Sequence, residues 1–420
     1  AEDGIRDDLV TGVQTCALPI WMTQLQDITL NLGSVAVIGA GGKMGRGILL
    51  CLLIAVFQNK LKASFIAMDV SKEALSHLKA YLIEHLSKKE LATEAQLDEV
   101  LETVSDISNV RNVEVVFEAI FESVSLKTEI FKSLAAQNGE EMTVFSNTSS
   151  IPIHHLESES GLEGRVIGFH FYNPPPVQRL LELIPSKNTK PDFLKKAENL
   201  AGSLNKEVVP SADIAGFIGN GHFIREGVFA CRQIGALSKQ WSIQDSIHII
   251  NIITKYGLVR PMGIFEVIAY VGPDVFEMIR QTMDAHLEED FSYQIKRTLS
   301  EMDLTLPKIE DQTDHWQQLG MTYSQEMDWK QVKQTGGSTQ NVMETIKQTA
   351  SLTTSGGALT RLFLSEHFRI GQQLVNDQVA ASIKDVDQVL KLGFHHLYGL
   401  ENVGHTFEIS GLNEKVTANE

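Results

Sequence analysis

Cysteine is scarce in this sequence, since Cys16, Cys51 and Cys231 are the only three among 420 residues. So few thiols argue against a disulfide framework and against a metal site built from several cysteines. Long apolar runs are also missing. The longest, residues 48–57, is far shorter than the roughly 20 residues that a membrane-spanning helix needs. We therefore expect a cytoplasmic chain without membrane insertion.

Positive charge is in deficit. Lysine and arginine together number 36 against 53 aspartates and glutamates, which gives a formal net charge of −17. This balance argues against nucleic acid and against an anionic membrane as partners. With 43% hydrophobic and 21% charged residues, the composition is that of a globular protein rather than a disordered chain or a coiled coil. The length is sufficient for two or three domains.

The first 20 residues lack the basic start and the small-residue cleavage site of a secretory signal. They resemble the translation of a sequencing-library adapter. We therefore expect residues 1–21 to be a non-native leader ahead of a native start near Met22, and Cys16 is left out of the folding argument.

From Ser34 onward, short apolar runs alternate with helical patterns. Runs at 35–38 and 64–68 flank a helix that extends through Asn59, and runs at 113–120 and 142–145 flank an amphipathic stretch. This β-α-β order predicts a parallel sheet covered by helices. Further strands are expected at 165–171, 180–184 and 207–209.

Beyond Ala212, long helical periodicities replace the strand pattern and predict an all-α C-terminal domain. Its early motifs, HFIR at 222–225 and IQD at 243–245, recur as HFR at 367–369 and IKD at 383–385, a faint internal repeat. The predicted domains are an α/β domain at 22–211, a helical domain at 212–300, a polar connector at 301–357 and a second helical copy at 358–420.

A glycine-rich turn follows the first strand and opens a helix: Gly39-Ala40-Gly41-Gly42-Lys43-Met44-Gly45. Glycines let a backbone approach a pyrophosphate closely, and the N-terminus of the helix stabilises its charge. We therefore predict that Gly39, Gly41, Gly42, Met44 and Gly45 contact a dinucleotide. The spacing is one residue longer than the usual Rossmann fingerprint, and a merely tight strand-to-helix turn is the alternative.

Asp69 ends the second strand, where a carboxylate can accept hydrogen bonds from ribose hydroxyls and repel a 2′-phosphate. This position favours NAD over NADP. The interval from Gly39 to Asp69 exceeds the usual spacing of about 20 residues, so we expect a long first helix or connection. A solvated acid at the end of a strand is the alternative.

Six further motifs follow in a distinctive order: FEAIFE at 117–122, SNTSS at 146–150, HFYNP at 170–174, LLELI at 180–184, GFIGN at 216–220 and RPMGIFE at 260–266. In this order they resemble the (S)-3-hydroxyacyl-CoA dehydrogenase family over residues 34–276. The resemblance implies a Rossmann-type NAD-binding domain followed by a helical domain. It also implies NAD as cofactor, and oxidation of the 3-hydroxyl of an acyl-CoA to a ketone in fatty-acid β-oxidation.

The resemblance assigns the central chemistry to His170 as general base and to Glu182 as the carboxylate that holds its imidazole. Histidine exchanges a proton near neutral pH, and a carboxylate fixes its tautomer and stabilises the imidazolium. Without the family context, a single histidine beside an apolar strand is more often structural.

By the same matching, Ser149 hydrogen-bonds substrate and nicotinamide, and Asn220 orients the substrate. Glu122, Lys127 and Asn173 would line the NAD site. Polar residues at helix starts are the alternative for Ser149 and Asn220, and a solvated pair is the alternative for Glu122 and Lys127.

Two positions depart from the family, which usually has Pro where Ala215 stands and Arg where Gly221 stands. These changes bear on the domain junction and on substrate length preference. The resemblance does not carry over the residues that contact CoA. Candidate phosphate partners are Lys72, Lys79, Lys88 and Lys89, although a solvated helix face is the favoured interpretation.

No metal is predicted, because the pairs His154-His155 and His395-His396 lack companions at ligand spacing. Three functions stay open: an acyl-CoA dehydrogenase of this family, a related enzyme acting on a small hydroxyacid or sugar acid, and a catalytically idle NAD-binding protein. Retention of the four predicted catalytic residues argues against the last. The repeat leaves two oligomeric states open, a monomer with an internal pseudo-dimer and a homodimer.

Overall fold

The computed structural model describes residues 33–295 and 298–407. The predicted leader lies outside these ranges, as does the end of the predicted second helical copy. The chain divides into two compact units. Of the described residues, the first comprises 33–147 with Glu157–Leu181 and Thr189–Val208, and the second comprises Thr148–Leu156, Glu182–Asn188, 209–295 and 298–407.

Eight strands form one sheet in the order β3-β2-β1-β4-β5-β6-β7-β8. Their bounds are β1 Gly33–Ile38, β2 Ala63–Met68, β3 Leu101–Val104, β4 Val115–Glu118, β5 Thr143–Ser146, β6 Val166–Phe171, β7 Leu180–Pro185 and β8 Glu207–Pro210. The five pairings from β3 to β6 are parallel. In the middle of the sheet, Val35 of β1 lies opposite Phe65 of β2 and Val115 of β4.

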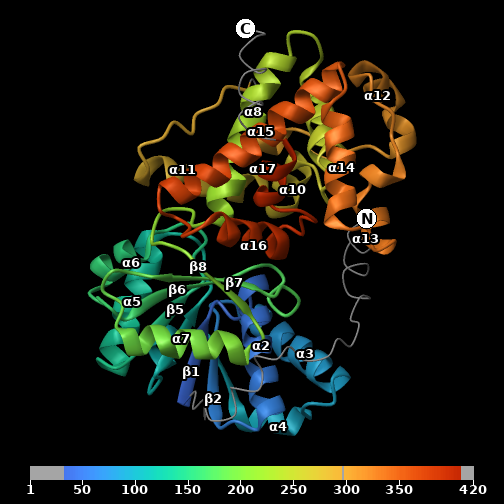
Figure 1. Cartoon of the computed structure of the whole chain (residues 1–420). Coiled ribbons are helices and arrows are strands. Elements are labelled where there is room, and N and C mark those ends of the chain that lie inside the picture. The colour runs from blue at the N-terminus through green and yellow to red at the C-terminus, as the bar shows by residue number, and fades with distance from the viewer. Residues whose placement is uncertain (1–32, 296–297, 408–420) are drawn as a thin grey trace. The chain divides into compact units, whose positions relative to one another are not determined.

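Helices connect these strands: α2 Lys43–Asn59, α3 Lys72–Lys88, α4 Glu94–Val100, α5 Val124–Asn138, α6 Ile153–Ser160 and α7 Pro191–Ser203 (Figure 1). Side-chain caps begin several of them. Ser71 caps α3, and Ser123 caps α5. At the other end of α5, the N–H of Gly139 donates to the Ala135 carbonyl, and the positive φ of 83° at Gly139 ends the helix.

Apolar strand residues explain the core of the first unit. The last four residues of β1 and all of β4 are buried, as expected for strands with helices on both faces. Phe117, Phe145 and Phe169 come from three neighbouring strands, and their ring centroids lie 5.0 to 5.9 Å apart. The predicted α/β fold is confirmed.

The edge strand β3 is absent from the sequence prediction. Only Val104 of its four residues is buried, so it has no apolar run by which a strand would be recognised. It is held instead by parallel pairing with β2, in which Phe65 lies opposite Leu101.

From residue 211 onward the described chain is helical (Figure 1). The helices are α8 Gly219–Leu237, α9 Ile243–Ile252, a π-helical turn Ile253–Gly257, α10 Ile264–Val271, α11 Pro273–His286, α12 Thr313–Leu319, α13 Trp329–Gln334, α14 Thr339–Ala350, α15 Ser355–Asn376, α16 Ile383–Gly393 and α17 Leu400–Phe407. One apolar cluster of buried and partly buried residues contains side chains from each of these helices except α16. Among the described residues, no helix is both long and apolar enough to cross a bilayer.

The motifs of the predicted repeat lie in two helix pairs, α8 with α9 and α15 with α16, but His222 is in the first turn of α8 whereas His367 is beyond the middle of α15. His222 of α8 and His367 of α15 pack ring against ring, with centroids 4.7 Å apart. At the start of α9 the Ser242 hydroxyl donates to Asp245, and at the start of α16 the Ser382 hydroxyl donates to Asp385. The starts of α9 and α16 therefore have the same serine-to-aspartate contact.

Candidate active site

The carboxyl ends of β1, β2 and β4 meet at the point where the strand order reverses, between β1 and β4. Open parallel sheets bind ligands in the crevice at such a switch point. The backbone N–H of Gly39, just after β1, donates to the carbonyl of Met68 at the end of β2. The glycine turn and Asp69 therefore lie together at this edge.

Close packing explains the glycines of the turn. Gly39 has a φ of 80°, and a Cβ added there would lie 2.5 Å from the Ala119 carbonyl oxygen. A Cβ on Gly45 would collide with the Gly39 carbonyl oxygen. These contacts draw the first turn of α2 against the end of β1. No side chain caps α2, and its first turn holds no acidic residue. The N-terminus of α2 is therefore suited to a phosphate anion.

Asp69 is bound to the turn itself. One carboxylate oxygen accepts the N–H of Gly41 at 2.9 Å, and the other accepts the N–H of Ser71 at 3.0 Å. A Cβ on Gly41 would lie 2.9 Å from the same carboxylate. Each carboxylate oxygen can accept more than one hydrogen bond, so these contacts still permit a ribose hydroxyl.

Lys127 is buried, only 1% exposed, and is paired with two carboxylates. Its Nζ lies 2.5 Å from Glu118 and 3.2 Å from Glu122. Glu118 also accepts the Ser146 hydroxyl at 2.5 Å. Burial lowers the pKa of the lysine, but the two carboxylates outweigh it and the pKa is raised. Lys127 is therefore a fixed positive charge between the carboxylates of Glu118 and Glu122.

Glu118 was missed by the sequence argument. It ends β4, where a fully buried carboxylate closes an otherwise apolar strand. An acidic residue directly after three buried apolar residues is the signal that could have identified it.

Glu182 lies in the second unit and is fully buried. Its Oε1 accepts the N–H of Ile218 at 2.9 Å and the N–H of Gly219 at 3.1 Å, at the start of α8. A helix N-terminus stabilises a negative charge, so the carboxylate is held in one place. His170 is the penultimate residue of β6 in the first unit and is 5% exposed.

Ser149 and Asn220 are brought together within the second unit. The Asn220 amide donates to the backbone carbonyl of Ser149 at 2.8 Å. In the first unit, the side chain of Asn147 accepts the N–H of Phe171 at 2.8 Å and so ties the SNTSS segment to the HFYNP segment. The chain next to His170 is therefore fixed by a side chain that the sequence argument did not single out.

Gly221 lies against the second helical pair. A Cβ on Gly221 would be 3.0 Å from Leu374 of α15 and 3.4 Å from Arg225. Arg225 donates to the Gly221 carbonyl and pairs with Glu289 at 2.8 Å. A side chain at position 221 would therefore begin in tight contact with Leu374.

Of the lysines considered as phosphate partners, Lys72, Lys79 and Lys88 lie on α3, and Lys89 follows its last residue. Lys79 pairs with Glu94 and Asp98, and Lys88 pairs with Glu84, all at exposed positions. These pairs support the interpretation of α3 as a solvated helix face.

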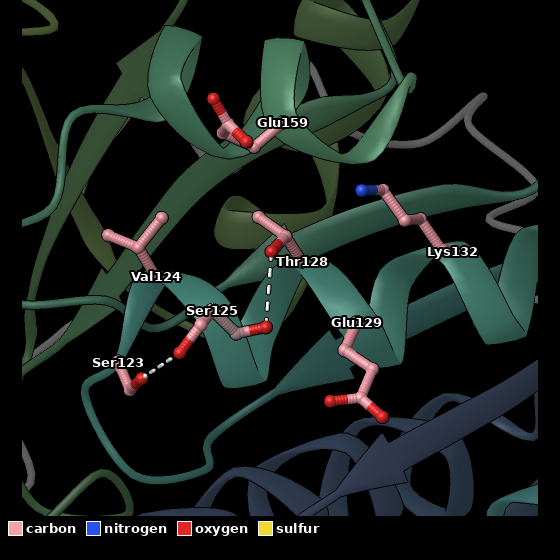
Figure 2. Close-up of a pocket in the computed structure, with 7 residues that line it drawn as sticks. All are labelled: Ser123, Val124, Ser125, Thr128, Glu129, Lys132 and Glu159. Carbon is pink, nitrogen blue, oxygen red and sulfur yellow. Dashed lines mark hydrogen bonds between the residues drawn. The ribbon is translucent and has the colours of Figure 1, made fainter.

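A cavity of about 580 Å³ opens at the first turns of α5 (Figure 2). Its lining residues are Ser123, Val124, Ser125, Thr128, Glu129, Lys132 and Glu159. The Ser123 and Ser125 hydroxyls hydrogen-bond each other at 3.1 Å. None of the predicted site residues lines this cavity, so it is not the predicted active site.

Residues 34–214 match the family model described as 3-hydroxyacyl-CoA dehydrogenase, NAD binding domain. The chain is 32% identical over 259 residues to the mitochondrial hydroxyacyl-coenzyme A dehydrogenase of Sus scrofa, and the match covers 58% of this chain and 78% of that protein. The chain belongs to the 3-hydroxyacyl-CoA dehydrogenase family. The NAD-binding domain predicted from the sequence is thereby confirmed.

Other relatives match less of their own length. The fatty acid oxidation complex subunit alpha of Shewanella putrefaciens is 29% identical over 262 residues, which is 61% of this chain but 35% of that protein. The chain thus spans about a third of the subunits of this kind that it matches.

Solved structures of the family agree with the fold. The 3-hydroxybutyryl-CoA dehydrogenase of Escherichia coli K12 has a TM-score of 0.62 at 19% identity, covering 93% of this chain and 96% of that one. FadB2 of M. tuberculosis has a TM-score of 0.53 at 25% identity, covering 69% and 95%.

Proposed function

We propose that the chain is an NAD-dependent 3-hydroxyacyl-CoA dehydrogenase, which interconverts (S)-3-hydroxyacyl-CoA and 3-oxoacyl-CoA in fatty-acid β-oxidation. The observation that carries the proposal is the match to the family's NAD-binding domain over residues 34–214. That range contains Ser149, His170 and Glu182. Asn220 follows six residues beyond it.

The residues at the carboxyl edge of the sheet fit a dinucleotide. Adding a Cβ at Gly39 or Gly45 would fill the space between β1 and α2, and the uncapped start of α2 is suited to the pyrophosphate. Asp69, fixed by the Gly41 N–H, would accept the ribose hydroxyls and repel a 2′-phosphate. Bound NAD would accept hydride from C3 of the substrate.

The proton moves separately from the hydride. His170 would take the proton of the 3-hydroxyl on a ring nitrogen as the C–O bond becomes a carbonyl. Glu182 would act through the imidazole by orienting it and stabilising its protonated form, and is therefore a positioning residue. Ser149 and Asn220, joined through the Ser149 carbonyl, would orient the substrate oxygen.

The test is NADH oxidation with acetoacetyl-CoA and with longer 3-oxoacyl-CoA thioesters, beside free hydroxyacids with NAD. Turnover of the thioesters alone supports the proposal. Turnover of the free acids alone would favour the related hydroxyacid or sugar-acid enzyme. NADH binding without turnover of either class would favour an idle NAD-binding protein.

A further inference from the structure

Three metal-ligating side chains gather in the helical unit, outside the predicted active site. Asp245 and His248 stand three residues apart on α9, a spacing that puts them on one face of the helix. His315 comes from α12, 67 residues further along. Its Nε2 lies 3.1 Å from Asp245 Oδ1, and the two imidazole rings meet at 87° with centroids 5.3 Å apart.

The three side chains offer one ligand atom each, and these atoms lie within 4.8 Å of one another. Zinc binds nitrogen and oxygen ligands at about 2.0 to 2.2 Å, which puts neighbouring ligand atoms of a tetrahedral site roughly 3.4 Å apart. Side-chain rotation is sufficient for a contraction of this size. Two imidazoles with a carboxylate form a donor set that zinc commonly uses.

The imidazoles have bonding capacity that the described chain does not use. Nδ1 of His248 and Nδ1 of His315 are both buried and have no hydrogen-bond partner among the described residues. A buried polar atom without a partner is costly, and two in adjacent rings need an explanation. Each ring makes a hydrogen bond through its other nitrogen, His248 with Gln244 and His315 with Asp245.

The surrounding charge favours a cation. Besides His315, the charged groups that act on the His248 imidazole are the carboxylates of Asp303 and Asp245, and no lysine or arginine is among them. Asp245 is itself 43% exposed at its side chain, so an ion has access from solvent.

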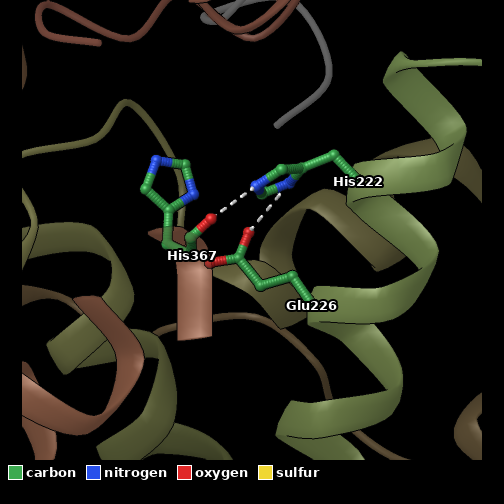
Figure 3. Close-up of side chains that lie close together, drawn as sticks. All are labelled: His222, Glu226 and His367. Atoms are coloured by element: carbon green, nitrogen blue, oxygen red, sulfur yellow. Dashed lines mark hydrogen bonds and ion pairs between the residues drawn. The ribbon is translucent and has the colours of Figure 1, made fainter. Parts of the chain in front are cut away.

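A second group with ligand types, His222, Glu226 and His367, is less suitable (Figure 3). There the Arg260 guanidinium lies 2.7 Å from Glu226, fully inside the unit. A divalent ion would face this buried positive charge at close range. The comparison therefore selects the group on α9 and α12.

We propose that Asp245, His248 and His315 bind one divalent transition-metal ion, with zinc as the best-fitting element, and that the ion fastens α12 to α9. Three protein ligands leave a fourth position for water. The proposal is independent of the dehydrogenase activity, because none of the three residues belongs to the predicted active site.

The experiment uses the full chain stripped of metal with EDTA and titrated with Zn²⁺ by calorimetry. Titration with Co²⁺, followed by its visible absorption and by quenching of the neighbouring Trp316, provides a second readout. We expect one ion per chain. Changing a residue that only supports a metal ligand typically weakens binding about 10- to 100-fold, and His315→Ala should weaken it at least as much.

Two controls make the result decisive. His315→Gln retains a hydrogen-bond donor toward Asp245, and it should also lose the ion. If His315→Ala fails to fold, His315→Gln therefore still tests the site. His405→Ala removes an exposed histidine of α17 and should bind like the wild type. Wild-type affinity in both His315 variants would overturn the proposal. Loss of the ion in His222→Gln alone would instead place the metal site at His222, Glu226 and His367, and would overturn the proposal.

Discussion

Acid should destabilise the helical unit through its buried histidines. His222 is 2% exposed and contacts His367, whose carbonyl oxygen lies 3.4 Å from its Nε2 (Figure 3). Burial lowers the pKa of His222 from 6.5 to about 4, with Arg260 and Arg225 acting in the same direction and Glu226 opposing them. The neutral form of His222 is therefore the one that the fold accommodates.

The sign and size of the effect follow from the difference in the pKa of His222 between the folded and the unfolded state. Because the folded pKa is depressed, the contribution to stability is complete above about pH 6.5 and is lost as the pH falls toward 4. At pH 5 the unfolded chain binds the proton and the folded chain does not, which removes about 2 kcal/mol of unfolding free energy. His367 and His396, whose pKa values are lowered by burial, add to the loss.

The assay is urea unfolding at pH 7 and at pH 5, in EDTA, followed by tryptophan fluorescence. Trp241, Trp316 and Trp329 all belong to the helical unit, so among described residues this signal reports that unit alone. In His222→Gln the difference between the two pH values should shrink by about 2 kcal/mol. The matched variant His405→Gln should keep the wild-type difference. An unchanged difference in His222→Gln would refute the reasoning.

Four further outcomes are expected. The Cβ of Gly45→Ala would meet the Gly39 carbonyl, so this variant should lose about 1 to 3 kcal/mol of unfolding free energy in chemical denaturation and bind NADH more weakly in a fluorescence titration. In the control Gly202→Ala nothing lies within 4 Å of the added Cβ, and the unfolding free energy should not fall. Steady-state kinetics should show higher efficiency with NADH than with NADPH because of Asp69, and equal efficiencies would remove its assigned role. His170→Gln should lower turnover of acetoacetyl-CoA about 10² to 10⁴-fold with NADH binding retained, and adding Glu182→Gln should cost little more, whereas additive losses would contradict a joint action. Light scattering should show a monomer if the second helical pair stands in for a partner subunit, and a stable dimer formed through α8 and α9 would exclude this.

Periodicity was sufficient for the α/β part of the fold because its strands are nearly continuous apolar runs. Residues 35–38, 64–68 and 142–145 were expected as strands and lie in β1, β2 and β5, apart from Met142, which precedes β5. The exposed edge strand β3 was missed because pairing with β2, rather than burial of its own residues, holds it in place. Backbone hydrogen bonds to a neighbouring strand do not depend on the hydrophobic pattern of the strand itself, so the sequence does not indicate them.

The tight packing of the glycine turn is predictable because its residues are neighbours in one motif, whereas contacts between distant residues are not. The site residues carried over from the family stay a prediction. The bond from Asn220 to the carbonyl of Ser149, 71 residues away, gives no signal in a sequence, and neither does the grouping of Asp245 with His315. The prediction of no metal rests on the two consecutive histidine pairs, whereas Asp245, His248 and His315 come together only in the fold.

Glu182 has a structural role in α8 besides the role proposed for it in the reaction. This carboxylate receives the N–H groups of Ile218 and Gly219, so the first turn of α8 depends on the side chain that the proposed reaction also needs. Replacing Glu182 by a residue without an acceptor would leave these two N–H groups without this hydrogen bond. The free energy of unfolding would then fall whether or not the protein is an enzyme. A descendant that no longer catalysed anything would still be under selection to keep an acceptor there. Retention of Glu182 alone is therefore weak evidence of activity in a relative.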